Sequence, residues 1–174
     1  MTSVVRRSAP NVIGRQVGRL VSHGDSVYRS LVPRVNAEEV RAEVVRFWNV
    51  FTAKSSELLE EFYAPDATVF PSFGNRAEPG RLTVARRRRE YFNKQASVRV
   101  QLGPIDVQLL DDLGAVASYT FKFHGLGIVS GSHKDAEETI ENGRATQVFC
   151  LDSEGRLRIL HEHLSSADVR DEGH

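Results

Sequence analysis

The chain has 174 residues, of which 40% are hydrophobic and 26% charged, with a formal net charge of +0. This composition is typical of a globular domain with its own core, and zero net charge argues against a surface that neutralises nucleic acid or an anionic membrane. From this charge we expect no nucleic-acid or membrane partner. The single cysteine excludes an internal disulfide framework and fits a reducing compartment, so we expect a cytoplasmic protein.

The first 36 residues differ in kind from the rest. Their six arginines face one acid, Asp25, and prolines and glycines interrupt any regular element. Val12, Ile13 and Val17 could belong to a short docking helix, while the Arg-rich composition also resembles a targeting segment. We expect residues 1–36 to be a basic extension, partly disordered or forming a docking helix, followed by one domain over residues 37–168 and a disordered tail over residues 169–174.

Three helices are expected at the start of the domain. Residues 37–53 place Val40, Val44, Phe47 and Phe51 on one stripe, with Asn36 as the N-cap. A second, short helix follows Ser55 or Ser56 and stops before Pro65. The third helix covers residues 82–95, and we assign its arginine run, residues 86–89, to the solvated side.

Strands are expected over most of the remaining chain. A short strand at residues 67–70 precedes the third helix, and from residue 97 onward apolar residues recur at every second position. This pattern predicts strands at residues 98–102 and 105–110, with a bend between them, and at residues 115–124. A hairpin over residues 143–166 turns at Asp152 to Gly155 and forms the C-terminal edge of the sheet. The order of elements predicts an α+β fold whose helices cover one face of a curved antiparallel sheet.

Three segments carry a resemblance to a known superfamily. They are FYAPDATVF after the second helix, REYF in the third helix, and D-x-x-G-R-x-R-I-L-H-x-H-x-S in the last hairpin. Together they resemble the nuclear transport factor 2-like superfamily, in particular SnoaL-like domains, over residues 38–167. The resemblance implies a cone-shaped antiparallel sheet wrapped around the long first helix, with two further helices and an apolar small molecule in the cone.

The resemblance also implies a function. It favours a SnoaL-like enzyme or binder, of the polyketide cyclase or isomerase type, that moves a proton next to a carbonyl without a metal or an organic cofactor. The alternative is a non-catalytic dimerisation or ligand-binding hub, because this fold supports both.

Two known activities of the superfamily are not expected from the residues at the matching positions. The tyrosine, the aspartic acid and the base of the ketosteroid isomerases fall on Phe47, Gln147 and Pro71, which cannot repeat that proton shuttle. The arginines that line the pocket of the calcium/calmodulin-dependent protein kinase association domain fall on Phe121, Gln147 and Leu164. These residues are uncharged, so an anion-binding pocket of that type is not expected either.

One carboxylate is the candidate for catalysis. Alternation along the last strand places Glu162 on the pocket side with Leu160 and Leu164, where desolvation would suit it to act as a general acid or base. The resemblance to SnoaL-like cyclases implies that Glu162 moves the proton while Gln147 or Tyr119 polarises the substrate oxygen. Aromatic residues are expected to form the rest of a concave wall. The predicted substrate-binding residues are Phe47, Phe51, Tyr63, Phe70, Phe73, Tyr91, Tyr119, Phe121, Gln147 and Phe149.

Alternatives remain open for the polar residues of the last strand. Glu162 could instead be a rim or interface carboxylate paired with Arg144, Arg158 or an arginine of the extension. His161 and His163 have a spacing that can hold a metal, but no third ligand is identifiable, so we assign them to an outer sheet face through which we expect a homodimer. If the strand faces the other way, His163 replaces Glu162 as the catalytic base.

Overall fold

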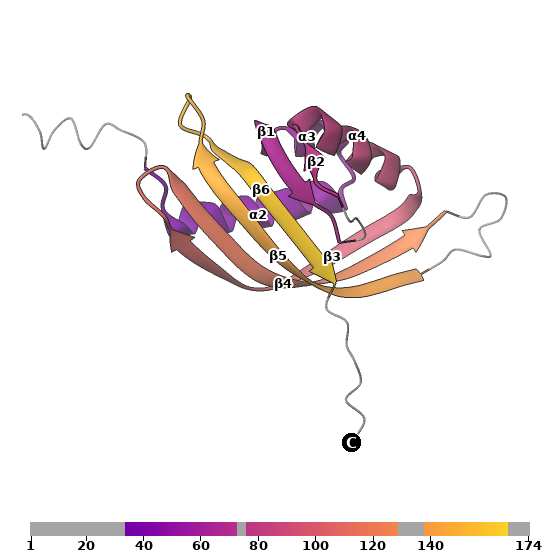
Figure 1. Cartoon of the computed structure of the whole chain (residues 1–174). Helices are drawn as coiled ribbons and strands as arrows, with labels where there is room; N and C mark the ends of the chain where they lie inside the picture. The colour runs from indigo at the N-terminus through magenta and orange to yellow at the C-terminus, as the bar shows by residue number, and fades with distance from the viewer. Residues whose placement is uncertain (1–33, 73–75, 129–137, 167–174) are drawn as a thin grey trace, which may run out of the picture. The chain divides into compact units, whose positions relative to one another are not determined.

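We describe residues 34–72, 76–128 and 138–166 of a computed structural model. The expectations for residues 1–33, for Phe73 and for the tail at residues 169–174 lie outside this part of the chain. Within it, three helices precede and interrupt a six-stranded sheet (Figure 1). The helices are α2 (Ala37–Thr52), α3 (Ser56–Glu60) and α4 (Arg81–Phe92). The strands are β1 (Tyr63–Phe70), β2 (Glu78–Pro79), β3 (Gln95–Leu109), β4 (Gly114–Gly127), β5 (Glu138–Leu151) and β6 (Leu157–Ser166).

The long helix α2 forms for the reasons that its sequence indicates. The side-chain oxygen of Asn36 accepts a hydrogen bond from the Glu39 amide at 2.9 Å, which satisfies one of the free N–H groups of the first turn. The apolar stripe faces the sheet and is buried along its whole length. Its buried residues are Val40, Val44, Phe47, Trp48 and Phe51.

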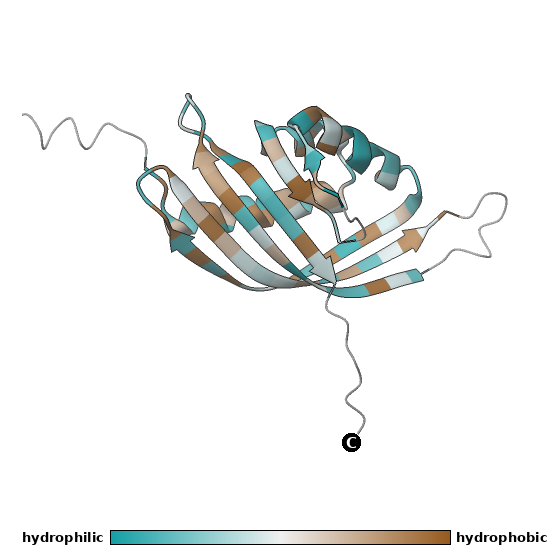
Figure 2. Ribbon diagram, viewed as in Figure 1, coloured by the Kyte–Doolittle hydropathy of each residue, from teal (hydrophilic) through white to brown (hydrophobic). Residues whose placement is uncertain are grey.

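The sheet has the strand order β2-β1-β6-β5-β4-β3 and curves around α2 (Figure 1). Hydrophobic and hydrophilic residues alternate along its long strands (Figure 2), and in β4 every second residue from Ala115 to Phe123 is buried. The predicted α+β class is therefore confirmed. One strand pair departs from the antiparallel pattern, because β1 runs parallel to β6 and makes the sheet mixed.

The last hairpin differs from the prediction in two ways. It does not form an edge, since β1 pairs with the outer side of β6. Its register also shifts at Leu160, because Val148 pairs with His161 while Phe149 pairs with Ile159. This bulge turns Ile159 into the core and leaves Leu160 37% exposed, so the prediction that Leu160 shares the inner side with Glu162 is wrong.

Aromatic rings fill the space between α2 and the sheet. Phe47 contacts Trp48, Phe62 and Tyr63 edge-on, with ring centroids 5.3 to 6.0 Å apart, which is a favourable arrangement for aromatic pairs. This core fixes α2 against the inner face of the sheet. Of the helices in the described ranges, none is long and apolar enough to cross a membrane.

Candidate functional site

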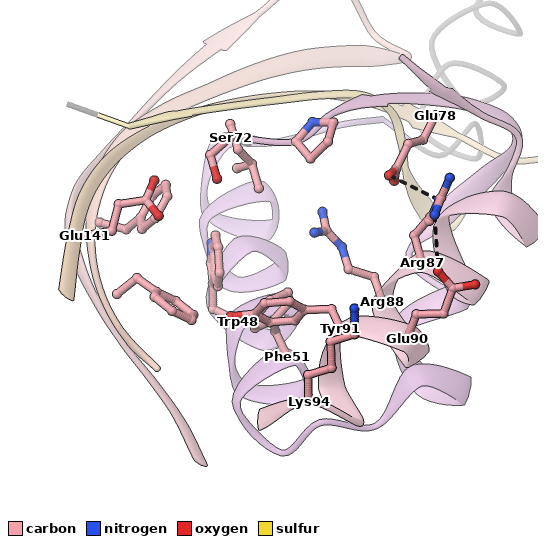
Figure 3. A pocket seen from close by; sticks show the side chains of 14 residues that line it. Trp48, Phe51, Ser72, Glu78, Arg87, Arg88, Glu90, Tyr91, Lys94 and Glu141 are labelled. Atoms are coloured by element: carbon pink, nitrogen blue, oxygen red, sulfur yellow. Dashed lines mark hydrogen bonds and ion pairs between the residues drawn. The ribbon is translucent and has the colours of Figure 1, made fainter. Parts of the chain in front are cut away.

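A cavity of about 300 Å³ opens where α2, α4 and the sheet meet (Figure 3). One part of its wall is apolar and aromatic, and comes from α2, β4, β6 and the end of α4. The other part is charged, and comes from β2, α4 and β5. The lining residues are Trp48, Phe51, Pro71, Ser72, Glu78, Arg87, Arg88, Glu90, Tyr91, Lys94, Phe121, Phe123, Glu141 and Leu164.

Arg88 is the buried charge of this wall. On α4 it lies in phase with the buried Val84 and Phe92, so the helix turns it toward the sheet, and its side chain is only 9% exposed. Its Nη2 donates to Oε1 of Glu162 at 2.8 Å. Figure 3 shows its guanidinium pointing into the cavity, toward the side on which Trp48 lies.

Glu162 lies behind Arg88 and is 0% exposed. The hydroxyl of Tyr63 donates to its Oε1 at 3.2 Å, and Nε2 of Gln147 donates to its Oε2 at 2.7 Å. Burial, followed by the nearby Glu162 carboxylate, raises the pKa of Tyr63 well above its ordinary value, so the hydroxyl keeps its proton. Three donors therefore hold this carboxylate, and it orients Arg88.

Arg88 has hydrogen-bonding capacity left for a ligand. Burial acts to lower the pKa of its guanidinium, but the neighbouring Tyr63 and Glu162 raise it above its ordinary value, so the group stays charged. Among the described residues its buried Nε has no hydrogen-bond partner. A charged guanidinium with a free N–H that lines a partly apolar cavity can bind an oxygen that carries or develops negative charge.

Three carboxylates line the cavity beside Arg88. Glu90 is 51% exposed and accepts a hydrogen bond from Arg87, and Glu141 accepts one from Ser166. Glu78 is more enclosed, with a side chain 18% exposed, and its nearest cation is Nε of Arg87 at 3.9 Å, which is too long for a hydrogen bond. Burial raises the pKa of Glu78 above its ordinary value, and Arg88 and Arg87 oppose this shift.

Three of the ten predicted substrate-binding residues line the cavity. They are Phe51, Tyr91 and Phe121. Phe47, Tyr63 and Phe149 are fully buried core residues, and Gln147 is covered as well, so none of these four belongs to the wall. Tyr119 is buried and also lies outside the wall, and its hydroxyl accepts a hydrogen bond from Nε1 of Trp48 at 2.7 Å.

Two further predictions are wrong about the face of the sheet on which the side chain lies. Phe70 points to the outer face of the sheet and is 38% exposed, with its ring 5.9 Å from those of His161 and His163. His163 is exposed on the same outer face, so it cannot replace Glu162 inside the domain. The described residues contain no group of three or more His, Cys, Asp or Glu side chains that could hold a metal ion.

Glu162 lies on the inner face, as its strand position predicts, but it does not line the cavity. Its cation is Arg88 rather than Arg144 or Arg158, and Arg158 instead donates to Asp152 at 2.9 Å. The assignment of all four arginines of the run to a solvated face is wrong for Arg88. Its spacing of four from both Val84 and Phe92 is the sequence signal that could have identified it.

Comparison with known proteins gives structural likeness only. No family model matches the sequence, and no curated protein matches it. Solved structures do match. A candidate calcium/calmodulin-dependent protein kinase II association domain from Xanthomonas campestris has a TM-score of 0.65 and 21% identity, covering 78% of this chain and 90% of that chain. A candidate dehydratase of the NTF2-like family from Streptomyces avermitilis has a TM-score of 0.66 and 15% identity, covering 75% and 95%.

A candidate scytalone dehydratase from Novosphingobium aromaticivorans is similar to the same extent, with a TM-score of 0.64 and 10% identity, covering 83% of this chain and 88% of that chain. At such identities the likeness concerns the fold and not the activity. The helices and the curved sheet agree with the architecture that the three sequence segments predict. The chain therefore has the fold of the nuclear transport factor 2-like superfamily.

Proposed function

We propose that this domain binds a small molecule with an apolar, aromatic body and a carbonyl oxygen, and that it moves a proton next to that carbonyl. The observation that carries the proposal is a charged, nine-tenths buried Arg88 that lines a partly aromatic cavity and whose Nε has no hydrogen-bond partner among the described residues. The cavity volume lies near the lower end of the range for small-molecule sites, roughly 300–1,000 Å³. Two of the similar structures are described as candidate dehydratases, so the fold is compatible with an enzyme.

Charge balance favours a carbonyl over a permanent anion. Glu162 already neutralises Arg88 at 2.8 Å, so a fixed anion in the cavity would add an unmatched negative charge. A carbonyl oxygen is neutral when it binds and gains negative charge only as the proton leaves. A preorganised guanidinium then stabilises the transition state more than the bound substrate, which is what accelerates a reaction.

Fluorescence of Trp48 gives a direct binding assay, because it is the single tryptophan of the chain and it lines the cavity. The probes are 2-acetonaphthone, an aryl ketone, and 2-isopropylnaphthalene, which has a similar shape but no oxygen. We expect the ketone to quench Trp48 at lower concentration than the hydrocarbon. A hydrogen bond to a charged group corresponds to about 10- to 100-fold in affinity.

The matched variants separate Arg88 from its neighbours. The double variant Arg88→Met/Glu162→Gln removes both buried charges together and should abolish the preference for the ketone. Arg86→Met, on the exposed side of the same helix, should keep it. Equal affinities for the two probes in the unmodified protein, or a preference that survives the double variant, would refute the proposal.

A second candidate function, a dimerisation hub, is favoured by the outer face of the sheet. Phe70 is exposed there between His161 and His163, and none of the described helices covers this face. We propose that a second copy of the chain packs against it. This role is compatible with a small-molecule site on the opposite face.

A further inference from the structure

We propose that Glu78 is the group that takes the proton from the substrate and returns it, opposite the oxygen that Arg88 binds. The inference rests on the proposed function and assigns a catalytic residue within it. It differs from the expectation drawn from the sequence, in which Glu162 fills this role.

Position separates Glu78 from Glu162. Glu78 lines the cavity, whereas Glu162 is fully buried behind Arg88 and does not. Figure 3 shows the side chains of Glu78 and Arg88 both directed into the same cavity, from β2 and from α4. A base must reach the proton that it removes, and of these two carboxylates only Glu78 borders the space that a ligand can enter.

Occupancy separates Glu78 from the other carboxylates of the wall. Within the described residues, Glu90 and Glu141 both accept hydrogen bonds, from Arg87 and Ser166, while Glu78 accepts none. The ion pair of Arg88 is made with Glu162, so Glu78 is not neutralised by direct contact with it. A carboxylate that is partly desolvated and lacks hydrogen bonds is a stronger base than one in water.

Proton transfer at this site balances without a further reactant. A C–H bond next to the carbonyl breaks, and its proton moves to the Glu78 carboxylate. The electron pair of that bond forms a C=C bond, and the carbonyl π electrons move to oxygen, where Arg88 stabilises the enolate. Protonated Glu78 then returns a proton to the same carbon or to the end of a conjugated system, which completes an enolisation or an isomerisation.

The chemistry can be measured with 2-acetonaphthone, whose methyl protons lie next to its carbonyl. In D₂O, catalysed enolisation replaces these protons by deuterium, and proton NMR follows the loss of the methyl signal. We expect the unmodified protein to accelerate this exchange and Glu78→Gln to slow it by about 100-fold or more, the usual range for general acid–base catalysis. The affinity for the ketone, read from Trp48, should change by less than about threefold, because Arg88 is retained.

Two further variants make the result specific. Glu57→Gln alters an exposed carboxylate of α3 that pairs with Arg89 outside the cavity, and should exchange at the unmodified rate. Glu78→Asp keeps the negative charge beside Arg87, but its shorter side chain holds the carboxylate farther from the substrate, so this variant should catalyse exchange at an intermediate rate. It replaces Glu78→Gln in the test if that variant does not fold.

The outcomes distinguish the two proposals. Loss of exchange with retained ketone binding supports the role of Glu78. Arg88-dependent binding with no exchange in the unmodified protein, or with exchange unchanged in Glu78→Gln and Glu78→Asp, overturns the role of Glu78 and leaves the binding site intact. Absence of ketone-selective binding refutes the proposed function itself.

Discussion

The site depends on one residue, Arg88, together with its counter-ion Glu162. The two groups meet at 2.8 Å with side chains 9% and 0% exposed, in contact with Tyr63 and Gln147. Such a pair contributes little net stability compared with apolar residues, but removing one member leaves the other buried without compensation. The pair therefore orients a functional group at some cost in stability.

Glu162→Gln should destabilise the protein strongly. Arg88 would keep its charge and lose its counter-ion, and breaking a buried pair in this way costs about 3–5 kcal/mol. The free energy of unfolding in urea measures the effect. Glu57→Gln, at an exposed pair, should leave the midpoint unchanged, and Arg88→Met/Glu162→Gln should recover part of the loss. A Glu162→Gln protein as stable as the unmodified one would show that the pair does not carry this role.

Gly143 determines the shape of the cavity through Phe121. The two residues are paired across β4 and β5, and a Cβ at position 143 would overlap the Phe121 ring. Gly143→Ala should therefore push the ring toward the cavity and toward Trp48, whose ring lies 5.1 Å away. We expect weaker quenching of Trp48 by 2-acetonaphthone and a loss of about 1–3 kcal/mol in stability.

The control for this change is Gly114→Ala, since a Cβ there would meet no atom closer than 3.5 Å. Its ketone affinity should equal that of the unmodified protein. Unchanged affinity in Gly143→Ala would mean that Phe121 does not shape the binding site.

Sequence patterns predict which face a residue occupies better than what it touches. Alternation along β6 places Glu162 inside correctly, because strand geometry is local. The partner of Glu162 is Arg88, which lies on another element 74 positions away in the chain, and a local sequence pattern cannot predict a contact between residues so far apart. Arg88 could have been recognised as inward-facing from Val84 and Phe92, but a run of four arginines masks this phase.

At the scale of elements, the β5–β6 hairpin is stabilised by its turn. Oδ1 of Asp152 accepts hydrogen bonds from the amides of Glu154 and Arg156 at 2.9 and 3.0 Å, and Gly155 has a φ of 74°. These interactions fix the register next to the turn, where Leu151 pairs with Leu157, and the bulge at Leu160 then brings Gln147 opposite Glu162. The turn was predictable because all of its determinants lie within a few residues of one another.

Gly155→Ala should destabilise the hairpin. A residue with a Cβ is strained in the left-handed region by about 1–2 kcal/mol. Chemical denaturation provides the measurement, with Glu154→Ala in the same turn as the control, because its exposed side chain pairs only with Arg156 in the described residues. An equal effect of the two substitutions would mean that the positive φ carries no special cost here.

The pairing of β1 with β6 was not predictable in the same way. Its two strands are distant in the chain and parallel, so no turn sequence announces the contact. The bulge at Leu160 was not predictable either, because β6 pairs with β5 on one side and with β1 on the other, and its register must suit both strands. The class of fold followed from the order of helices and strands, whereas the neighbours of β6 required the structure.

For the molecule as a whole, the two faces of the sheet differ in what they present. The inner face holds the core and the cavity, and the outer face exposes Phe70 with His161 and His163. We expect the full chain to sediment as a dimer and Phe70→Asp to shift it toward a monomer, because the substitution places a charge in an apolar contact. Leu58→Asp, at an exposed position on α3, should leave the dimer unchanged. A monomer in the unmodified protein would exclude the hub.

The central claim, that Arg88 presents a prepared charge to a carbonyl in an aromatic cavity, is tested most directly by a crystal structure of the complex with 2-acetonaphthone. We predict that the ketone oxygen accepts a hydrogen bond from the Arg88 guanidinium at about 3 Å, with the naphthalene rings against Trp48 and Phe121. A ketone bound elsewhere, or bound in the cavity with its oxygen turned away from Arg88, would contradict the account.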